Sequence, residues 1–289
     1  MNPTNFIEFK KERALGEIIS DTFKFIRQQY KNYFISVVKI TGPFLLLALV
    51  AVVMYFITAS DLFNDSARDL SGGFLASFFG VAFFFVLAII VLYSLLMITS
   101  FYYIKSYVDN KGDVSFQEVK SNVLKKIWKF LILSFIVGFT TVIGMYLCLI
   151  PGIYIGVVFS MAAPLMIFKD YGVGDALSNS FNLVKGVWWP TFGVLITVYL
   201  LIAILGQAFS LPALIYMFVK MGLSLSNEDP TAIGGLFEDP VYLILNVLSY
   251  AFQFVLYSVS IIAISFVYFD LNEQKHQTGT YEKIENIGQ

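Results

Sequence analysis

The sequence predicts an all-α polytopic membrane protein with six transmembrane helices arranged as three hairpins, each preceded by a cytoplasmic amphipathic helix. Hydrophobic residues make up 58% of the chain and charged residues only 13%, about half of the roughly 25% found in soluble domains. Mean hydropathy is +0.76. Several apolar runs also approach or exceed the roughly 20 residues that a helix needs to cross the hydrocarbon core.

Six apolar runs are candidate spans. Pro43 and Pro212 fall inside two of them, where neighbouring helices can satisfy the freed backbone groups. A tight reversal at Pro151-Gly152 is expected to join the third run to the fourth, which is short for a span. The runs cover about residues 37–59, 73–103, 130–150, 153–168, 191–219 and 241–269.

The distribution of Lys and Arg predicts that both termini lie in the cytoplasm. Basic residues gather before the first run, between the second and third, between the fourth and fifth, and after the sixth. The segments near 60–72 and 221–239 are acidic instead. Since cytoplasmic segments retain Lys and Arg, we expect a multi-pass protein with both termini on the cytoplasmic side.

An internal repeat organises the chain. Residues 15–34 align without a gap on residues 173–192, and residues 114–131 form a weaker third copy. The expected organisation is a polar segment at 1–14, a single membrane domain at 15–269 and a cytoplasmic tail at 270–289. The repeats cover about 15–104, 111–169 and 172–269, and they are parallel about an axis along the membrane normal.

Each repeat copy reads as an amphipathic helix that lies in the membrane interface or packs against the protein's own loops. In the first copy, one face carries Leu15, Ile18, Ile19, Phe23, Ile26 and Tyr30. Cations on these helices, and the aromatic pair that precedes the fifth run, are candidate contacts for a protein partner or for lipid headgroups. These candidates are Lys24, Arg27, Lys120, Lys125, Lys185, Trp188 and Trp189.

Inside the runs, small and polar residues suggest helix packing. Gly152, Gly156 and Ser160 form a stripe at which another helix can approach closely. Gln207, Asn246 and Gln253 are a candidate intramembrane polar cluster, which serves either interhelical hydrogen bonds or a substrate path. Ionisable residues are missing from the centres of the runs, which argues against a proton relay or an ion pump. Lys39, near the inner end of the first run, can snorkel to the interface.

The residue counts predict no cofactor, no metal and no catalysis. The single cysteine, Cys148, cannot form an internal disulfide, and we expect it to be a small buried hydrophobe. The single histidine, His276, excludes zinc sites built from several His or Cys ligands. A net charge of −1 gives no electrostatic case for nucleic acid. Phosphate-binding loops, nucleophile elbows, zinc helices and redox CxxC motifs are missing, and the polar first 14 residues do not form a signal peptide.

One stretch carries a family resemblance. Residues 150–194 combine a proline-glycine hairpin, a small-residue span that ends in a proline, and a helix reading ALSNSFNLVKGVWW. This stretch resembles the glycerophosphoryl diester phosphodiesterase membrane-domain family and its YciC-like bacterial relatives. The resemblance implies a bacterial cytoplasmic-membrane protein. It does not imply phosphodiesterase activity, because the soluble barrel that carries the acidic metal ligands and histidines of that enzyme is missing.

Three functional hypotheses follow. The first is a non-catalytic accessory or scaffold protein that works through protein partners, which are other integral membrane proteins, and through membrane lipids. The alternative is a transporter or lipid-handling protein. Its layout resembles that of mitochondrial carriers, but their P-x-[DE]-x-x-[KR] signature is missing. The third is a membrane enzyme that acts on lipid. Fold class alone does not choose between them.

Overall fold

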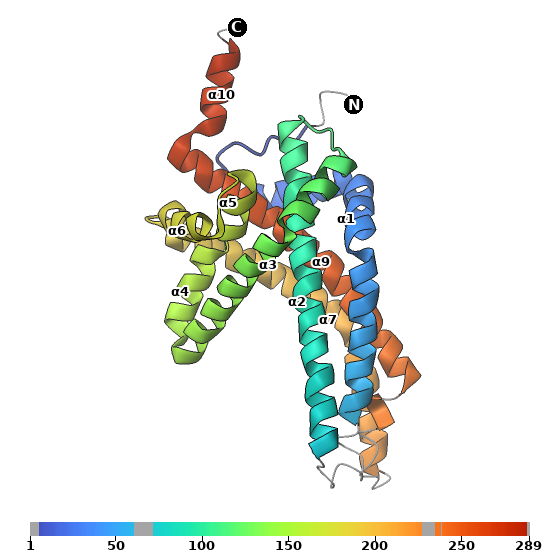
Figure 1. Cartoon of the computed structure of the whole chain (residues 1–289). Helices are drawn as coiled ribbons and strands as arrows, with labels where there is room; N and C mark the ends of the chain where they lie inside the picture. Colours follow the sequence, from blue (N-terminus) through green and yellow to red (C-terminus); the bar gives the residue numbers. More distant parts are fainter. Residues whose placement is uncertain (1–5, 61–71, 227–234, 238, 288–289) are drawn as a thin grey trace. The chain divides into compact units, whose positions relative to one another are not determined.

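A computed structural model describes residues 6–60, 72–226, 235–237 and 239–287, and every labelled element within these ranges is an α-helix (Figure 1). Six helices or helix pairs are long and apolar enough to cross a membrane. The prediction of an all-α polytopic membrane protein is therefore confirmed. The helices are α1 (Leu15–Ser60), α2 (Gly72–Asp109), α3 (Phe116–Leu147), α4 (Leu149–Phe159), α5 (Ala162–Phe168), α6 (Val173–Val184), α7 (Trp188–Ser226), α9 (Pro240–His276) and α10 (Thr278–Ile287).

Five of the described helices exceed the length of a span. α1, α2, α3, α7 and α9 contain 46, 38, 32, 39 and 37 residues, whereas roughly 20 suffice to cross the hydrocarbon core. In α1 and α3 the amphipathic segment runs into the apolar segment without a break. Only the third amphipathic segment forms a helix of its own, α6.

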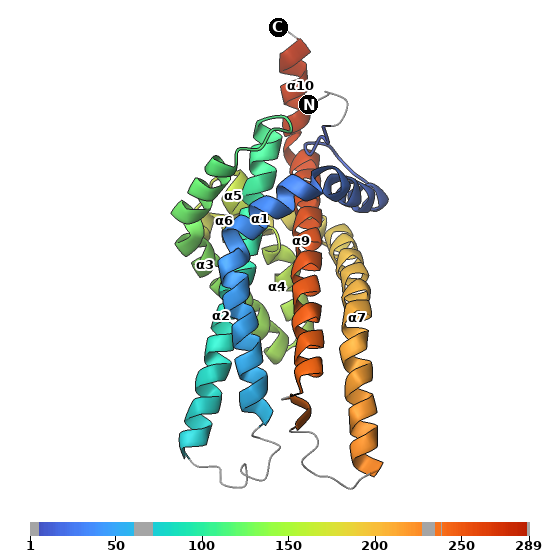
Figure 2. The same cartoon turned by 90° about the vertical axis from the view of Figure 1, so that its right-hand side faces the viewer.

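The chain divides into two compact units. Unit 1 contains residues 1–40, 94–201 and 258–289, and unit 2 contains residues 41–93 and 202–257. The helices α1, α2, α7 and α9, labelled in Figure 2, therefore each contribute one end to unit 1 and the other to unit 2.

Unit 1 has an aromatic core to which the N-terminal segment contributes. Phe9 is 1% exposed, and its ring stacks on Phe266 of α9 with centroids 4.2 Å apart. Phe25 meets Phe9 edge to face at 5.5 Å and Tyr107 at 5.1 Å. Aromatic pairs of this geometry add about 0.5–1.5 kcal/mol beyond the burial of their area. The segment expected to be merely polar is thus anchored in the core.

Unit 2 contains the other ends of α1, α2, α7 and α9. Tyr55 of α1 stacks on Phe85 of α2 with ring centroids 5.0 Å apart. Phe209 of α7 stacks on Phe252 of α9 at 4.1 Å, and the Ser249 hydroxyl donates to the Phe209 carbonyl at 3.1 Å. Aromatic stacking thus joins α1 to α2 and α7 to α9.

The reversal between α3 and α4 differs from the prediction. The chain turns at Cys148, whose backbone is extended, and Pro151-Gly152 lies inside the first turn of α4. Proline suits this place because the first amides of a helix have no partner within it. Cys148 is exposed at the turn, so the expectation of a buried cysteine was wrong.

The predicted fourth span is interrupted. α4 ends at Phe159, and α5 begins at Ala162 after a turn at Ser160 and Met161. Residues 162–167 are all buried in unit 1. The continuous apolar sequence concealed this break, because both pieces have the composition of one helix.

The polar tail is helical. α9 continues to His276, Gln277 adopts a left-handed conformation with φ 49°, and α10 follows. His276 is therefore the last residue of α9.

Candidate functional site

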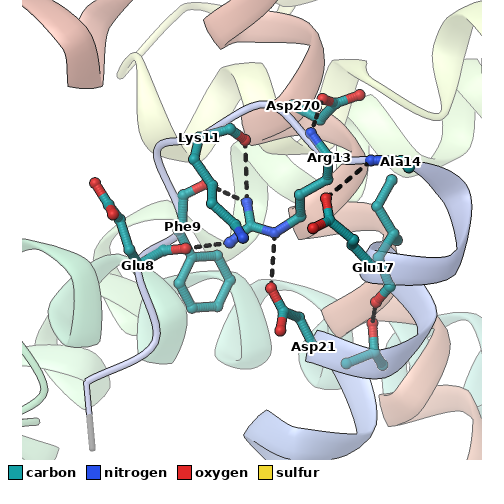
Figure 3. A network of polar contacts seen from close by, with 10 residues as sticks. Glu8, Phe9, Lys11, Arg13, Ala14, Glu17, Asp21 and Asp270 are labelled. Atoms are coloured by element: carbon teal, nitrogen blue, oxygen red, sulfur yellow. Dashed lines mark hydrogen bonds and ion pairs between the residues drawn. The ribbon is translucent and has the colours of Figure 1, made fainter. Parts of the chain in front are cut away.

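Arg13 ties the N-terminal segment to α1 and α9 (Figure 3). Its side chain is fully buried, and its Nε donates to Asp21 Oδ2 at 2.9 Å. Nη1 donates to the Phe9 carbonyl at 2.7 Å, and Nη2 donates to the Glu8 carbonyl. The backbone amide of Arg13 donates to Asp270 Oδ1 at 2.7 Å. A guanidinium presents five donors in a planar fork, which suits it to satisfy several acceptors of one folded segment.

The tail closes over the same segment. Glu273 accepts hydrogen bonds from the amides of Gly279 at 2.8 Å and Thr280 at 2.9 Å, which sets the start of α10. A Cβ at Gly279 would lie 2.3 Å from the Lys10 carbonyl, so the tail approaches the N-terminal segment as closely as glycine allows. Ion pairs then join the two segments: Lys10 with Glu282, and Glu8 with Lys283 at 2.7 Å. We call this arrangement the terminal clamp (residues 8–13 with 270–283).

The candidate cations of the amphipathic segments lie on the surface of unit 1. They are not brought together into one cluster: two lie on α1, two on α3 and one at the end of α6, next to exposed apolar side chains. On α1, Phe23 and Tyr30 are 48% and 60% exposed, and on α3, Trp128 is 76% exposed. Mixed cationic and apolar surfaces of this kind suit the headgroup layer of a membrane. All five cations are exposed: Lys24, Arg27, Lys120, Lys125 and Lys185.

The predicted apolar face of the first amphipathic segment is only partly buried. Ile18 lies in the core, but Leu15, Phe23 and Tyr30 are exposed. The side chains packed against unit 1 are instead Ile18, Thr22, Phe25, Gln29 and Tyr33. These five residues are three or four positions apart, which is the spacing of one helix face. Sequence reasoning missed this face because it counted only apolar residues and so left out Thr22 and Gln29.

The tryptophan pair begins α7. Trp188 stacks on Tyr154 of α4 with ring centroids 5.6 Å apart and on Phe192 at 5.2 Å. Trp189 is 74% exposed. Trp188 thus packs the start of α7 against α4, whereas the indole ring of Trp189 is exposed on the surface.

The small residues pack α4 against α3. A Cβ at Gly152 would lie 2.4 Å from the Met145 amide nitrogen, and a Cβ at Gly156 would lie 3.4 Å from Thr141. Ser160 caps the end of α4 and donates to the Val157 carbonyl at 2.7 Å.

The intramembrane amides bond within their own helices. Gln207 accepts from Ser210 at 3.1 Å, and Asn246 donates to the Tyr242 carbonyl at 2.8 Å. Gln253 Cγ lies 4.0 Å from where a Cβ at Gly206 would stand, so α7 and α9 meet there. These contacts serve the helices and their packing in unit 2.

A cavity that sequence reasoning missed lies beside α1 in unit 1. It has a volume of about 240 Å³, and its polar lining includes Gln29, Asn32, Ser36 and Lys39. Tyr103 donates to Gln29 at 3.1 Å, and Lys39 Nζ lies 5.3 Å from the centre of the Phe116 ring. The i, i+3, i+7, i+10 spacing of Gln29, Asn32, Ser36 and Lys39 places them on one face of a helix and was a usable signal. The lining offers a phosphate or carboxylate one cation and several neutral donors, and it also includes one carboxylate, Asp113.

Within the described ranges, no group of three or more His, Cys, Asp or Glu residues is placed to hold a metal ion. No family model, curated protein or solved structure matches this chain.

Proposed function

We propose that this chain is a non-catalytic accessory or scaffold protein of a bacterial cytoplasmic membrane, and that it works through partners bound at its cytoplasmic side. Both termini and the three amphipathic segments lie on that side. The observation that supports the proposal is the terminal clamp, because it holds the N-terminal segment and the tail helix against α9 next to exposed cations and aromatic residues.

The tail helix supplies a protein-facing element. Tyr281 and Ile284 are 65% and 61% exposed on α10, and they are three residues apart, so they share a face. An amphipathic helix with such anchors fits a groove on another protein. Fixing α10 beforehand through Glu273 lowers the entropy cost of that binding.

An internal repeat is part of the proposal. The copies at 15–34 and 173–192 bury and expose equivalent side chains, and two equivalent hydroxyls, those of Thr22 and Ser180, donate to backbone carbonyls of the preceding turn at 2.7 Å. Equivalent environments at equivalent positions support these two copies as repeats with a common side of the membrane. The buried pairs are Ile18 with Ala176, Thr22 with Ser180 and Phe25 with Leu183, and the exposed pairs are Phe23 with Phe181 and Arg27 with Lys185.

Site-specific photocrosslinking tests the proposal. A photoreactive amino acid at Tyr281 or Ile284 should yield one predominant protein adduct in cells, and the same residue at Ile35, which is also exposed, should not. Substituting Lys24 and Arg27 together by Glu should reduce recovery of that partner, whereas Lys111→Glu on an exposed turn should not. Adducts that are equally diverse at all positions would overturn the scaffold proposal.

Catalysis is not part of the proposal. The purified chain should release no glycerol phosphate from glycerophosphodiesters, with or without added divalent metal ions. Release that is abolished by a carboxylate substitution in this chain would contradict the proposal.

The alternative, a lipid-handling protein, is favoured by the cavity beside Lys39. A cation next to neutral donors and an aromatic ring fits an anionic lipid headgroup. Under this alternative, Lys39→Gln lowers the amount of phosphatidylglycerol that copurifies with the protein, and Lys24→Gln, at a residue that does not line the cavity, does not.

A further inference from the structure

The α3–α4 hairpin ends in an entirely uncharged tip (residues 145–151). Tyr146, Leu147 and Ile150 are 93%, 80% and 77% exposed. The segments that join α1 to α2 and α7 to α9 are different, because both carry several Asp or Glu residues. The tip therefore lacks the polar residues expected of a loop that emerges into water.

α6 sets a limit on how much of the hairpin lies in the hydrocarbon core. Asp175, Asn182 and Lys185 at one side of α6 are exposed, and groups of this kind stay out of the apolar layer. Phe181 of α6 meets Phe159, the last residue of α4, with ring centroids 5.5 Å apart. α6 thus lies at the end of α4 that is remote from the tip (Figure 1), and the hydrocarbon core begins no farther from the tip than Phe159.

The distance from Phe159 to the tip is too short for the hairpin to cross the bilayer. α4 has 11 residues, which is about 16 Å at about 1.5 Å per residue, whereas the hydrocarbon core is about 30 Å thick. α5 adds nothing, since residues 162–167 are buried within unit 1. The stacking of Trp188 on Tyr154 places an interfacial type of side chain still nearer to the tip.

The turn itself tolerates an apolar environment. Backbone groups in hydrocarbon must be hydrogen-bonded within the protein. The Cys148 amide donates to the Gly144 carbonyl at 3.0 Å, and the Cys148 carbonyl accepts from the Gly152 amide at 3.3 Å. Pro151 has no amide hydrogen, which removes one of the unpaired donors at the start of α4.

We propose that the α3–α4 hairpin is re-entrant: it enters the bilayer from the side on which α6 lies, ends near the midplane, and its tip contacts lipid acyl chains. By length and composition, α3 could span a membrane, and so could α4 and α5 taken together. Under this proposal, however, neither segment crosses the bilayer. The remaining long helices α1, α2, α7 and α9 cross, so both termini still lie on one side. The inference goes beyond the scaffold function and does not depend on any partner.

The native protein contains its own probe. Cys148 is the only cysteine and is exposed at the tip, so a small fluorophore can be attached to it in detergent before reconstitution into phosphatidylcholine vesicles. We expect nitroxides deep in the acyl chains to quench this fluorophore more strongly than headgroup nitroxides or aqueous iodide. The midplane is equidistant from both surfaces, so the orientation of the protein in the vesicles does not affect the result.

A matched control carries Cys148→Ser and a cysteine at Asp65, between α1 and α2. Its fluorophore should be quenched by headgroup nitroxides and iodide. The re-entrant proposal is overturned if the Cys148 fluorophore behaves like this control, because a complete crossing would bring the tip to the opposite headgroups.

Discussion

The backbone amide of Arg13 donates to the carboxylate of Asp270 at 2.7 Å, although the two residues are 257 positions apart. Arg13 also lies over the Phe266 ring, with its guanidinium carbon 4.7 Å from the ring centre. The bond joins the segment before α1 to the end of α9 that belongs to unit 1. The terminal clamp is therefore a long-range feature of the fold and not a local cap of α1.

Removing the buried guanidinium should destabilise unit 1. Arg13→Ala leaves the Glu8 and Phe9 carbonyls without their donor and Asp21 without its cation, and loss of one partner from a buried pair costs about 3–5 kcal/mol. Thermal unfolding in detergent measures this as a lower midpoint. Arg27→Ala, at an exposed position of the same helix, should change stability by no more than about 0.5 kcal/mol. Equal midpoints for the two variants would refute a structural role for the clamp.

Two glycines of the α3–α4 hairpin should respond oppositely to alanine. A Cβ at Gly152 would lie 2.4 Å from the Met145 nitrogen, whereas a Cβ at Gly138 meets nothing within 4 Å. Gly152→Ala should destabilise the protein by about 1–3 kcal/mol through overpacking, and Gly138→Ala should be neutral or slightly stabilising because alanine favours helices. The unfolding midpoints of the two purified variants give the comparison.

The topology prediction concerns the sides of the loops. In a Cys148→Ser background, cysteines at Asp65 and Asp229 should react with an impermeant thiol reagent added to cells whose outer barrier is permeabilised. A cysteine at Lys111 should react only after the cytoplasmic membrane is opened. Labelling at Lys111 in intact cells would reverse the orientation proposed from the Lys and Arg bias.

Asp239 gives a pH-dependent contribution to stability. Lys220, whose Nζ lies 3.0 Å from Asp239 Oδ2, and the Tyr216 hydroxyl at 2.8 Å lower the pKa of Asp239 to about 2, below about 3.9 for an unperturbed aspartate. The folded state thus binds its proton less readily than the unfolded state. The stabilisation is fully present above about pH 4 and is lost as the pH falls through about 2.

The difference in stability between the native protein and Asp239→Asn reports this contribution. It should be constant near neutral pH and shrink as the pH approaches 2. A difference that does not depend on pH between 6 and about 2 would show that the Lys220 pair does not favour the ionised carboxylate.

Much of the architecture was predictable because hydropathy is a local property. The predicted runs at 37–59, 73–103, 191–219 and 241–269 all lie inside single helices of the structure. The error at 150–168 arose because hydropathy does not register a break between two apolar helices. The place of the turn depends on Gly152, which lets α4 approach the Met145 backbone, and a Pro-Gly pair at a helix start resembles the same pair in a loop.

The candidate residues show a similar division. The exposure of Lys24, Arg27 and Lys185 was predictable from amphipathic spacing, since a charged side chain seeks water or headgroups. The buried partners of Arg13 were not, because nothing near Arg13 in the sequence indicates that Asp270 will be its acceptor. The cavity beside Lys39 was missed for the same reason: α1 supplies one wall, and Tyr103 and Phe116 supply the other.

The sequence by itself determined that this chain is an all-α membrane protein with six apolar segments, because the cost of placing charged groups in hydrocarbon depends on composition alone. Only the tertiary structure decided where the α3–α4 hairpin turns, which face of α1 enters the core, and that the segments 8–13 and 270–283 are clamped together. Those features depend on contacts between residues such as Arg13 and Asp270, and such contacts exist only once distant segments have packed.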